Sequence, residues 1–293
     1  MRLHVGCAMW NLKSWQGRFL PPRLAAPERL RHYAAWCNAV EGNTTFYATP
    51  APEAVASWAE QTPADFRFVL KLPRVITHER RLTGAEAELG AFLDAVAPLG
   101  PRAHALWVQL PGSFTPADTA TLARFLRTLP RTHRYAVEVR HPAFFTDARA
   151  ARRLEDSLAP VAAEWIPFDT TAFFASPPTS DAEREAWTNK PRMPLRTHAL
   201  TDRPIVRYLG RDDTARTVAG WQRWVGVVAG WLAQGRTPTV FLHTPDNADA
   251  PGLARRFHDE VRARVPGLEP LPDPVPADPV PADPLPAEPS TLF

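Results

Sequence analysis

Eight short apolar runs occur along this chain, and a segment with helical character follows each of them. Most of the runs lead into a polar residue that a hydrophobic core would not require. Regular alternation of strand and helix is typical of α/β proteins with a parallel sheet. Eight such units predict a single (β/α)8 TIM barrel, a closed fold whose active site lies at the carboxyl ends of the strands. The runs cover residues 3–7, 39–40, 66–70, 105–108, 135–139, 161–167, 205–206 and 240–242.

Apolar residues recur at helical spacing between these runs. The longest interval, residues 170–202, is rich in Pro, Ser and Thr and contains a basic run at 190–192. Loops of this length are often lids or binding loops, and a plain surface excursion is the alternative. The expected helices cover residues 27–36, 52–60, 85–97, a segment that begins at Thr115, 148–158, 181–189, 218–233 and 251–265.

A length of 293 residues and an apolar fraction of 45% fit one large α/β domain, which we place at residues 1–265. From residue 266 the composition changes to repeated Pro-Ala-Asp-Pro units. Such a segment cannot bury a core, so residues 266–289 are expected to be a disordered, extended linker. Residues 290–293 are then a short terminal peptide, in which Leu292 and Phe293 are candidate partner-binding anchors.

The net charge is only +3, and lysine occurs only at Lys13, Lys71 and Lys190. Arginine suits bidentate recognition of phosphate or carboxylate, so a nucleic-acid ligand stays open beside a simple compositional bias. Cys7 and Cys37 lack metal or redox spacing and are expected to be buried thiols of a reducing compartment. No signal peptide and no bilayer-length apolar run is seen, which predicts a cytoplasmic protein without a membrane partner.

The polar residues at the ends of the runs are the candidate site. Glu41 and Asn43 lie on one side of a strand and could bind a metal, a sugar hydroxyl or a base edge. The alternative for Glu41 is a structural ion pair with Lys71 or an arginine. Glu138 and Arg140 share a side, and with His141 they offer acid/base groups and an anion clamp, or else a buried structural Glu–Arg pair.

The eighth run ends the ring beside the first, so His243 and Asp246 could bind a metal or orient one another. No metal or nucleotide motif and no nucleophile elbow is present, so chemistry would fall to carboxylates, histidines and basic residues. A divalent metal remains open as cofactor, with no ligands assigned. The predicted catalytic residues are Glu41, Glu138, His141, Asp169, His243 and Asp246. The predicted substrate-binding residues are Trp10, Asn43, Lys71, His78, Gln109, Arg140, Arg207 and Asn247.

Six motifs form an ordered set along residues 1–265. They are VEGNTTFY at 40–47, WAEQTP at 58–63 with DFRF at 65–68, QLP at 109–111, VEVRHP at 137–142, IVRYLGRDD at 205–213 and FLHTPDN at 241–247. This set resembles the YecE-like family, a TIM-barrel family of unknown function. The resemblance implies the barrel fold and supplies no activity. The end of the chain also resembles the bacterial sliding-clamp-binding peptide, although Pro289 replaces its glutamine and Thr291 its Ser or Asp.

Three functions are compatible with these residues. The first is a hydrolase, metal-dependent or acid/base, acting on a phosphate-bearing or nucleic-acid substrate, plausibly in DNA repair. Metal-binding barrels of the apurinic-endonuclease and xylose-isomerase type offer a fold-level analogy for it. The second is a non-catalytic module that binds a small anionic ligand and docks on the sliding clamp through its tail. The third is a sugar-phosphate isomerase or lyase.

Overall fold

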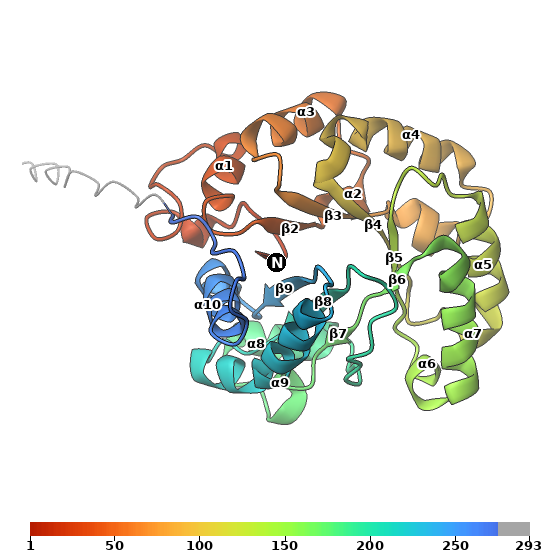
Figure 1. Cartoon of the computed structure of the whole chain (residues 1–293). Coiled ribbons are helices and arrows are strands. Elements are labelled where there is room, and N and C mark those ends of the chain that lie inside the picture. Colours follow the sequence, from red (N-terminus) through yellow and green to blue (C-terminus); the bar gives the residue numbers. More distant parts are fainter. Residues whose placement is uncertain (275–293) are drawn as a thin grey trace, which may run out of the picture.

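The computed structural model describes residues 1–274. In that range nine parallel strands form one sheet in the order β6-β5-β4-β3-β2-β1-β9-β8-β7. The sheet curls around a central axis, and helices cover its outer side (Figure 1). The strands are β1 (His4–Cys7), β2 (Ala39–Gly42), β3 (Arg67–Lys71), β4 (Ala103–Gln109), β5 (Tyr135–Glu138), β6 (Glu164–Trp165), β7 (Phe168–Asp169), β8 (Ile205–Leu209) and β9 (Thr239–His243).

The strand count differs from the sequence prediction at one place. The run at 161–167 was expected to give one strand of a closed eight-stranded barrel, and the structure has two short strands, β6 and β7, there. Pro167, between them, has no N–H to donate to a ladder, although its carbonyl accepts from Arg207 N at 3.0 Å. β6 pairs with β5, and β7 pairs with β8, so the fold is a curled parallel α/β sheet whose two edge strands are consecutive in the chain.

Every expected helix is present, with small shifts at the ends. The segment at 27–36 is a 3₁₀ turn (Ala26–Glu28) and a short helix, and the expected 251–265 helix ends at Arg262. Asp147, Ser180 and Asp213 begin three helices by accepting a bond from a backbone N–H of the first turn. The helices are α1 (Arg29–Tyr33), α2 (Thr44–Tyr47), α3 (Pro52–Gln61), α4 (Glu86–Val96), α5 (Thr119–Thr128), α6 (Ala143–Thr146), α7 (Ala148–Leu158), α8 (Asp181–Asn189), α9 (Thr214–Ala233) and α10 (Ala250–Arg262).

Alternate residues of each strand divide the core into two parts. One set packs under the helices in a single large cluster, as do Phe68 and Val240. The other set faces the inside of the curled sheet, because successive side chains of a strand point to opposite faces. This inner cluster is small and consists of Ala39, Val69, Ala105, Trp107, Ala136, Ile166, Ile205 and Phe241. It fills the sheet interior below the strand ends where the polar residues lie.

The described part of the segment after Val265 packs against the domain. Leu268 and Leu271 are buried in the main core, and Glu269 forms an ion pair with Arg2 at 2.8 Å. The remainder of the predicted linker, and the predicted terminal peptide with Leu292 and Phe293, lie outside the described residues. Both cysteines are buried and free, as expected. None of the helices within residues 1–274 combines the length and apolar content needed to cross a membrane.

Candidate functional site

The inner face of the sheet changes from apolar to polar within two residues on six strands. Ala39 is followed on the same face by Glu41, Val69 by Lys71, and so on around the ring, because residues i and i+2 share a face. The polar set therefore forms one layer directly above the inner cluster, at the carboxyl ends of the strands. Its members are Glu41, Lys71, Gln109, Glu138, Arg207 and His243, all buried.

Arg207 lies at the centre of this layer. Its Nε and Nη2 donate to the two carboxylate oxygens of Glu41 at 2.9 and 3.0 Å, and its Nη1 donates to Glu138 Oε2 at 2.9 Å. The arginine fork matches carboxylate geometry, which makes such bidentate pairs short and well oriented. Arg207 thus ties β8 to β2 and β5 across the inside of the sheet.

Three further groups complete what we call the Arg207 cluster. Lys71 Nζ lies 3.6 Å from Glu41 Oε1, and His243 Nε2 lies 3.0 Å from Glu41 Oε2. Arg140 Nε donates to Glu138 Oε1 at 2.8 Å. The alternatives kept open from the sequence, an ion pair of Glu41 with Lys71 or an arginine and a pair of Glu138 with Arg140, are both present.

Both glutamates of the cluster are carboxylates at neutral pH. Burial alone would raise the pKa of Glu41, but the charge of Arg207, with His243 and Lys71, holds that pKa well below its ordinary value. Burial opposes Arg207 and Arg140 in the same way at Glu138, whose pKa is also lowered. Because ionised Glu41 can only accept, His243 must donate its Nε2–H. The glutamates hold the cationic groups in place rather than supply protons.

The surroundings of Lys71 bring its pKa close to neutrality. Burial lowers the pKa of its ammonium to about 7; Glu41 works against this, and the positive charge of Arg207 adds to it. The amine lies 4.3 Å from the centre of the Trp107 ring and 5.7 Å from that of Phe46. Burial therefore shifts Lys71 toward its neutral amine form.

A cavity of about 650 Å³ lies above the cluster. Every charged side chain that lines it is Lys or Arg, while the two glutamates lie beneath, fully buried. Gln109 also lines it, and its buried Oε1 has no hydrogen-bond partner among the described residues. The lining residues are Ala8, Met9, Asn11, Asn43, Phe46, Tyr47, Lys71, Arg74, His78, Gln109, Arg140, Phe168, Asn189, Lys190, Pro191, Arg207, His243 and Asn247.

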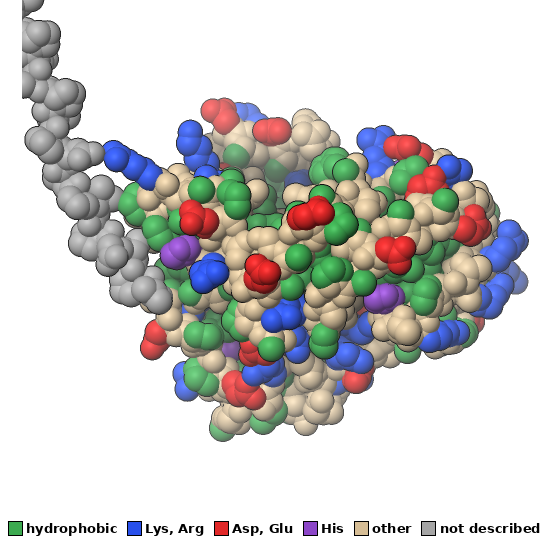
Figure 2. Space-filling view, turned by 90° about the horizontal axis from the view of Figure 1, so that it is seen from above, with side chains coloured by type: hydrophobic (Ala, Val, Ile, Leu, Met, Phe, Trp, Pro, Cys, Tyr) green, Lys and Arg blue, Asp and Glu red, His purple; other side chains and the backbone are tan. Residues whose placement is uncertain are grey.

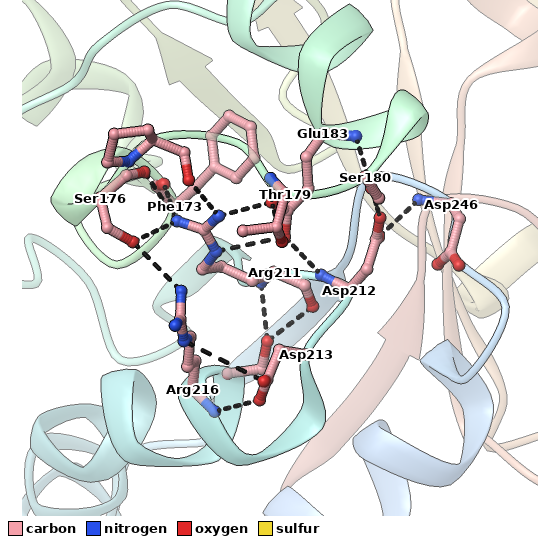
Figure 3. Close-up of polar contacts among 12 residues, drawn as sticks. Phe173, Ser176, Thr179, Ser180, Glu183, Arg211, Asp212, Asp213, Arg216 and Asp246 are labelled. Carbon is pink, nitrogen blue, oxygen red and sulfur yellow. Dashed lines mark hydrogen bonds and ion pairs between the residues drawn. The ribbon is translucent and has the colours of Figure 1, made fainter.

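The long segment after β7 contributes three of these lining residues, at the end of α8. A buried arginine, Arg211, anchors it: Nε donates to Glu183 at 3.1 Å, and Nη1 and Nη2 donate to the carbonyls of Ser176 and Pro177 at 2.7 Å each. Figure 3 shows Arg211 enclosed by this segment, with Asp212 bridging Ser180, which caps α8, and the backbone N–H of Asp246. The network fixes α8 against the loops that follow β8 and β9.

The other end of this segment is held as well. Thr170 Oγ1 donates to Pro191 O at 3.1 Å and accepts from Met193 N at 2.9 Å. Arg192 lies over the rings of Phe174 and Trp187. Lys190 is therefore held at the cavity from both sides, and a binding role for the 170–202 segment stays a prediction.

The comparisons with known proteins cover most of the chain. A family model described as "Protein of unknown function DUF72" matches residues 4–278. The chain belongs to the DUF72 family. The UPF0759 protein YecE of Escherichia coli strain K12 is 36% identical over 270 residues, 92% of this chain and 96% of that protein, and the protein of the same name from O157:H7 gives the same values. The YecE-like resemblance is thus confirmed.

Two solved DUF72 structures share the fold. A DUF72 family protein from Thermotoga maritima MSB8 has a TM-score of 0.68 at 20% identity, covering 89% of this chain and 100% of that one. One from Enterococcus faecalis V583 has a TM-score of 0.62 at 20% identity, covering 88% and 96%. Both likenesses concern the fold and carry no activity to this chain.

Of the fourteen predicted catalytic and substrate-binding residues, ten line the cavity or belong to the Arg207 cluster, and four do neither. Asp169 Oδ2 accepts from Trp224 Nε1 at 2.6 Å, under α9, because Phe168 takes the inner face and Asp169 the outer one. Asp246 Oδ1 accepts from Thr244 Oγ1 at 3.0 Å, within its own loop.

The other two are engaged locally. The ring nitrogen Nδ1 of His141 accepts from Ala143 N at 3.2 Å, at the start of α6. Trp10 packs edge-on against Trp58 and Phe68, with ring centres 5.3 and 6.4 Å away. Neither side chain reaches the cavity lining, because each has found a partner within its own loop or in the outer core.

Several lining residues were missed from the sequence. Lys190 belongs to the basic run noted in the long loop, which was a usable signal. Phe168 follows the inner-face position Ile166 by two residues, so strand periodicity could have found it. Phe46 lies in the four-residue helix α2 and Arg74 directly precedes the helical turn Val75–Glu79. Segments this short gave no period from which the directions of these side chains could be counted.

The arrangement does not fit a divalent metal. Within residues 1–274, no three His, Cys, Asp or Glu side chains come together as a ligand set. The oxygens of Glu41 and Glu138 already accept from Arg207, and a metal would also face the positive charges of Lys71 and Arg140.

Proposed function

We propose that this chain is a sugar-phosphate isomerase or lyase, which binds a small phosphate-bearing ligand in the cavity and acts on it by proton transfer. The observation that carries the proposal is that the charged lining residues are all cationic. The carboxylates that balance part of this charge lie below the cavity and are paired with Arg207 and Arg140, so an anion in the cavity meets the cationic groups first. Arg140 donates one of its five N–H groups to Glu138, which leaves four N–H groups that can donate to a ligand.

The size of the cavity also supports a small ligand. A volume of about 650 Å³ lies inside the range of small-molecule sites. A nucleic-acid surface would instead need a continuous basic stripe. On the face in Figure 2, Lys and Arg are interspersed with Asp and Glu, which does not favour that alternative. The concentration of positive charge is internal, at the cavity.

Catalysis, rather than binding alone, is supported by the proton inventory. A general acid or base works best when its pKa is close to the operating pH, and Lys71 meets this condition with a pKa of about 7. His78, whose pKa burial lowers to about 4, lines the same cavity as a neutral imidazole. These two groups could move protons on a ligand that Arg140, Arg207 and Lys190 hold.

We also infer that residues 164–169 act as one interrupted strand. β6 is bonded to β5 and β7 to β8, and only Ile166 and Pro167 separate them. Counted in this way, the sheet has the eight strand-plus-connection units of a (β/α)8 barrel. In that fold the carboxyl strand ends carry the active site, which agrees with the position of the Arg207 cluster.

Calorimetry with glycerol 3-phosphate and with glycerol tests the binding part. The phosphate ester should bind to the full chain and glycerol should not. Arg74→Gln combined with Lys190→Gln removes two exposed cations of the lining and should weaken binding about tenfold or more, since each 1.4 kcal/mol is a factor of ten. Arg127→Gln with Arg152→Gln, two exposed arginines outside the cavity, is the matched control. Equal binding of both ligands would overturn the proposal.

Proton exchange tests the catalytic part. A panel of phosphorylated aldoses and ketoses would be incubated with the protein in D₂O and followed by NMR. The proposal expects deuterium to enter beside the carbonyl group of at least one member, or a carbon–carbon bond there to break. Binding without exchange or cleavage in any member would reduce the chain to an anion-binding module.

A further inference from the structure

Lys71 occupies an unusual position even among buried lysines. It is the last residue of β3, its side chain is 9% exposed, and it lines the floor of the cavity. Among the described residues its Nζ has no hydrogen-bond partner, since Glu41 Oε1 is 3.6 Å away. An ammonium group has three N–H donors, and burying it with one ion pair and no hydrogen bond is costly. A neutral amine with a free lone pair is the form that this environment favours.

A structural role for Lys71 is not required by charge balance. Both oxygens of Glu41 already accept from Arg207 at 2.9 and 3.0 Å, and His243 adds a third bond at 3.0 Å. The amine contacts the faces of Trp107 and Phe46 rather than a row of acceptors. Desolvated lysines beside other cations are the ones that proteins use as nucleophiles toward carbonyl groups.

We propose that Lys71 Nζ attacks the carbonyl carbon of a phosphorylated aldehyde or ketone and forms an imine with it. The inference rests on the proposed function, because the cationic lining is what would hold the phosphate. In the first step the nitrogen lone pair forms the N–C bond, the C=O π pair moves to oxygen, and one amine proton is transferred to that oxygen. In the second step the C–O bond breaks, and the oxygen leaves as water with the second amine proton. The net change is amine plus carbonyl giving imine plus water.

The neighbours of Lys71 suit each stage of this reaction. Once protonated, the imine carries a positive charge 3.6 Å or so from the Glu41 carboxylate, which stabilises it. Gln109 Oε1, buried and without a partner among the described residues, can accept from a hydroxyl of the ligand. A protonated imine withdraws electrons from the adjacent carbon. It therefore assists loss of a proton or cleavage of a carbon–carbon bond there, the two reactions of an isomerase and a lyase.

The composition of the chain makes the test unusually clean. Lysine occurs only at positions 13, 71 and 190, so adducts can be assigned completely. The full chain would be incubated with glyceraldehyde 3-phosphate and sodium borohydride, which reduces an imine to a stable secondary amine. Intact mass then counts adducts, and peptide mapping locates them. We expect one dominant adduct, at Lys71, which inorganic phosphate suppresses and which unphosphorylated glyceraldehyde does not give.

Two variants and one binding measurement separate the outcomes. Lys71→Met matches the neutral side chain in length and cannot form an imine, so it should fold and lose the adduct, while Lys13→Arg, an exposed position outside the cavity, should keep it. Lys71→Arg, which is permanently charged and also cannot form an imine, is the second variant. If calorimetry detects glycerol 3-phosphate binding but Lys71 carries no adduct, the imine is wrong and the proposed anion site stands. Adducts shared equally with Lys13, unaffected by phosphate, would also overturn it. If no phosphate ester binds, the proposed function fails too.

Discussion

Replacing Glu41 by Gln tests the central role that we assign to its charge. The substitution keeps the shape of the side chain and removes a carboxylate that faces two N–H groups of Arg207 at 2.9 and 3.0 Å. Breaking one partner of a buried ion pair typically costs 3–5 kcal/mol. Arg207 retains its bond to Glu138, so we expect the lower end, about 3 kcal/mol. At roughly 2–4 °C per kcal/mol the melting temperature falls by about 6–12 °C.

Glu138→Gln is the matched comparison. Glu138 accepts one bond from Arg207 and one from Arg140, which is 24% exposed and can turn to solvent. We expect a cost of about 2 kcal/mol, in the range of one hydrogen bond to a charged group. The two variants would be compared by urea denaturation of the full chain at pH 7, with circular dichroism as the signal. The order of the two effects matters more than either value.

The stabilisation that the Glu41 charge provides should depend on pH. The folded-state pKa of Glu41 lies well below its ordinary value of 4.5, so its charge stabilises the fold above pH 4.5. That stability is lost as the pH falls through the folded-state pKa. The gap between wild type and Glu41→Gln should therefore be full at pH 6 to 7 and should shrink below about pH 4.5. A variant within about 0.5 kcal/mol of wild type at pH 7, or a gap that persists unchanged in acid, would refute the reasoning.

Three other predictions concern the remaining parts of the site. Burial lowers the Lys71 pKa from 10.5 to about 7, so between pH 7 and pH 10.5 the folded state binds fewer protons than the unfolded state. The stability of wild type relative to Lys71→Met should therefore rise from pH 7 toward pH 10.5. A stability difference that stays constant over this range in urea denaturation would contradict this. Asp169→Asn should lower the melting temperature, because the hydrogen bond from Trp224 is weakened. Calorimetry should show unchanged binding of glycerol 3-phosphate. Weaker binding would indicate that Asp169 contributes to the site after all. Glu183→Gln should loosen the segment that Arg211 holds, because Arg211 loses a charged partner. Limited proteolysis within residues 176–192 should become faster, and phosphate esters should bind more weakly. Unchanged cleavage would show that this anchor is dispensable.

The sequence predicted the site where strand periodicity determines which way a side chain points. Glu41, Glu138 and Arg207 lie two residues beyond small or apolar inner-face positions, and all three are in the cluster. Asp169 was misplaced although the same count would have assigned it to the outer face, because the inner-face position Ile166 is followed two residues later by Phe168. Lining residues such as Arg74 and Phe46 lie in or beside single helical turns, which are too short to show a period in the sequence.

The sequence did not determine which charged side chains pair with one another. The sequence offered Glu41 and Glu138 either as catalytic groups or as members of ion pairs, and only the distances decide between these roles. With Arg207 able to reach both carboxylates, the low dielectric of the interior favours mutual pairing over a free carboxylate. In the cluster two carboxylates then balance two of the three cations Lys71, Arg140 and Arg207. The uncompensated positive charge can be lost in two ways, either by an anion entering the cavity or by Lys71 giving up its proton. An anion that enters the cavity favours the ammonium form of Lys71, so the imine that we propose starts from the neutral form of Lys71.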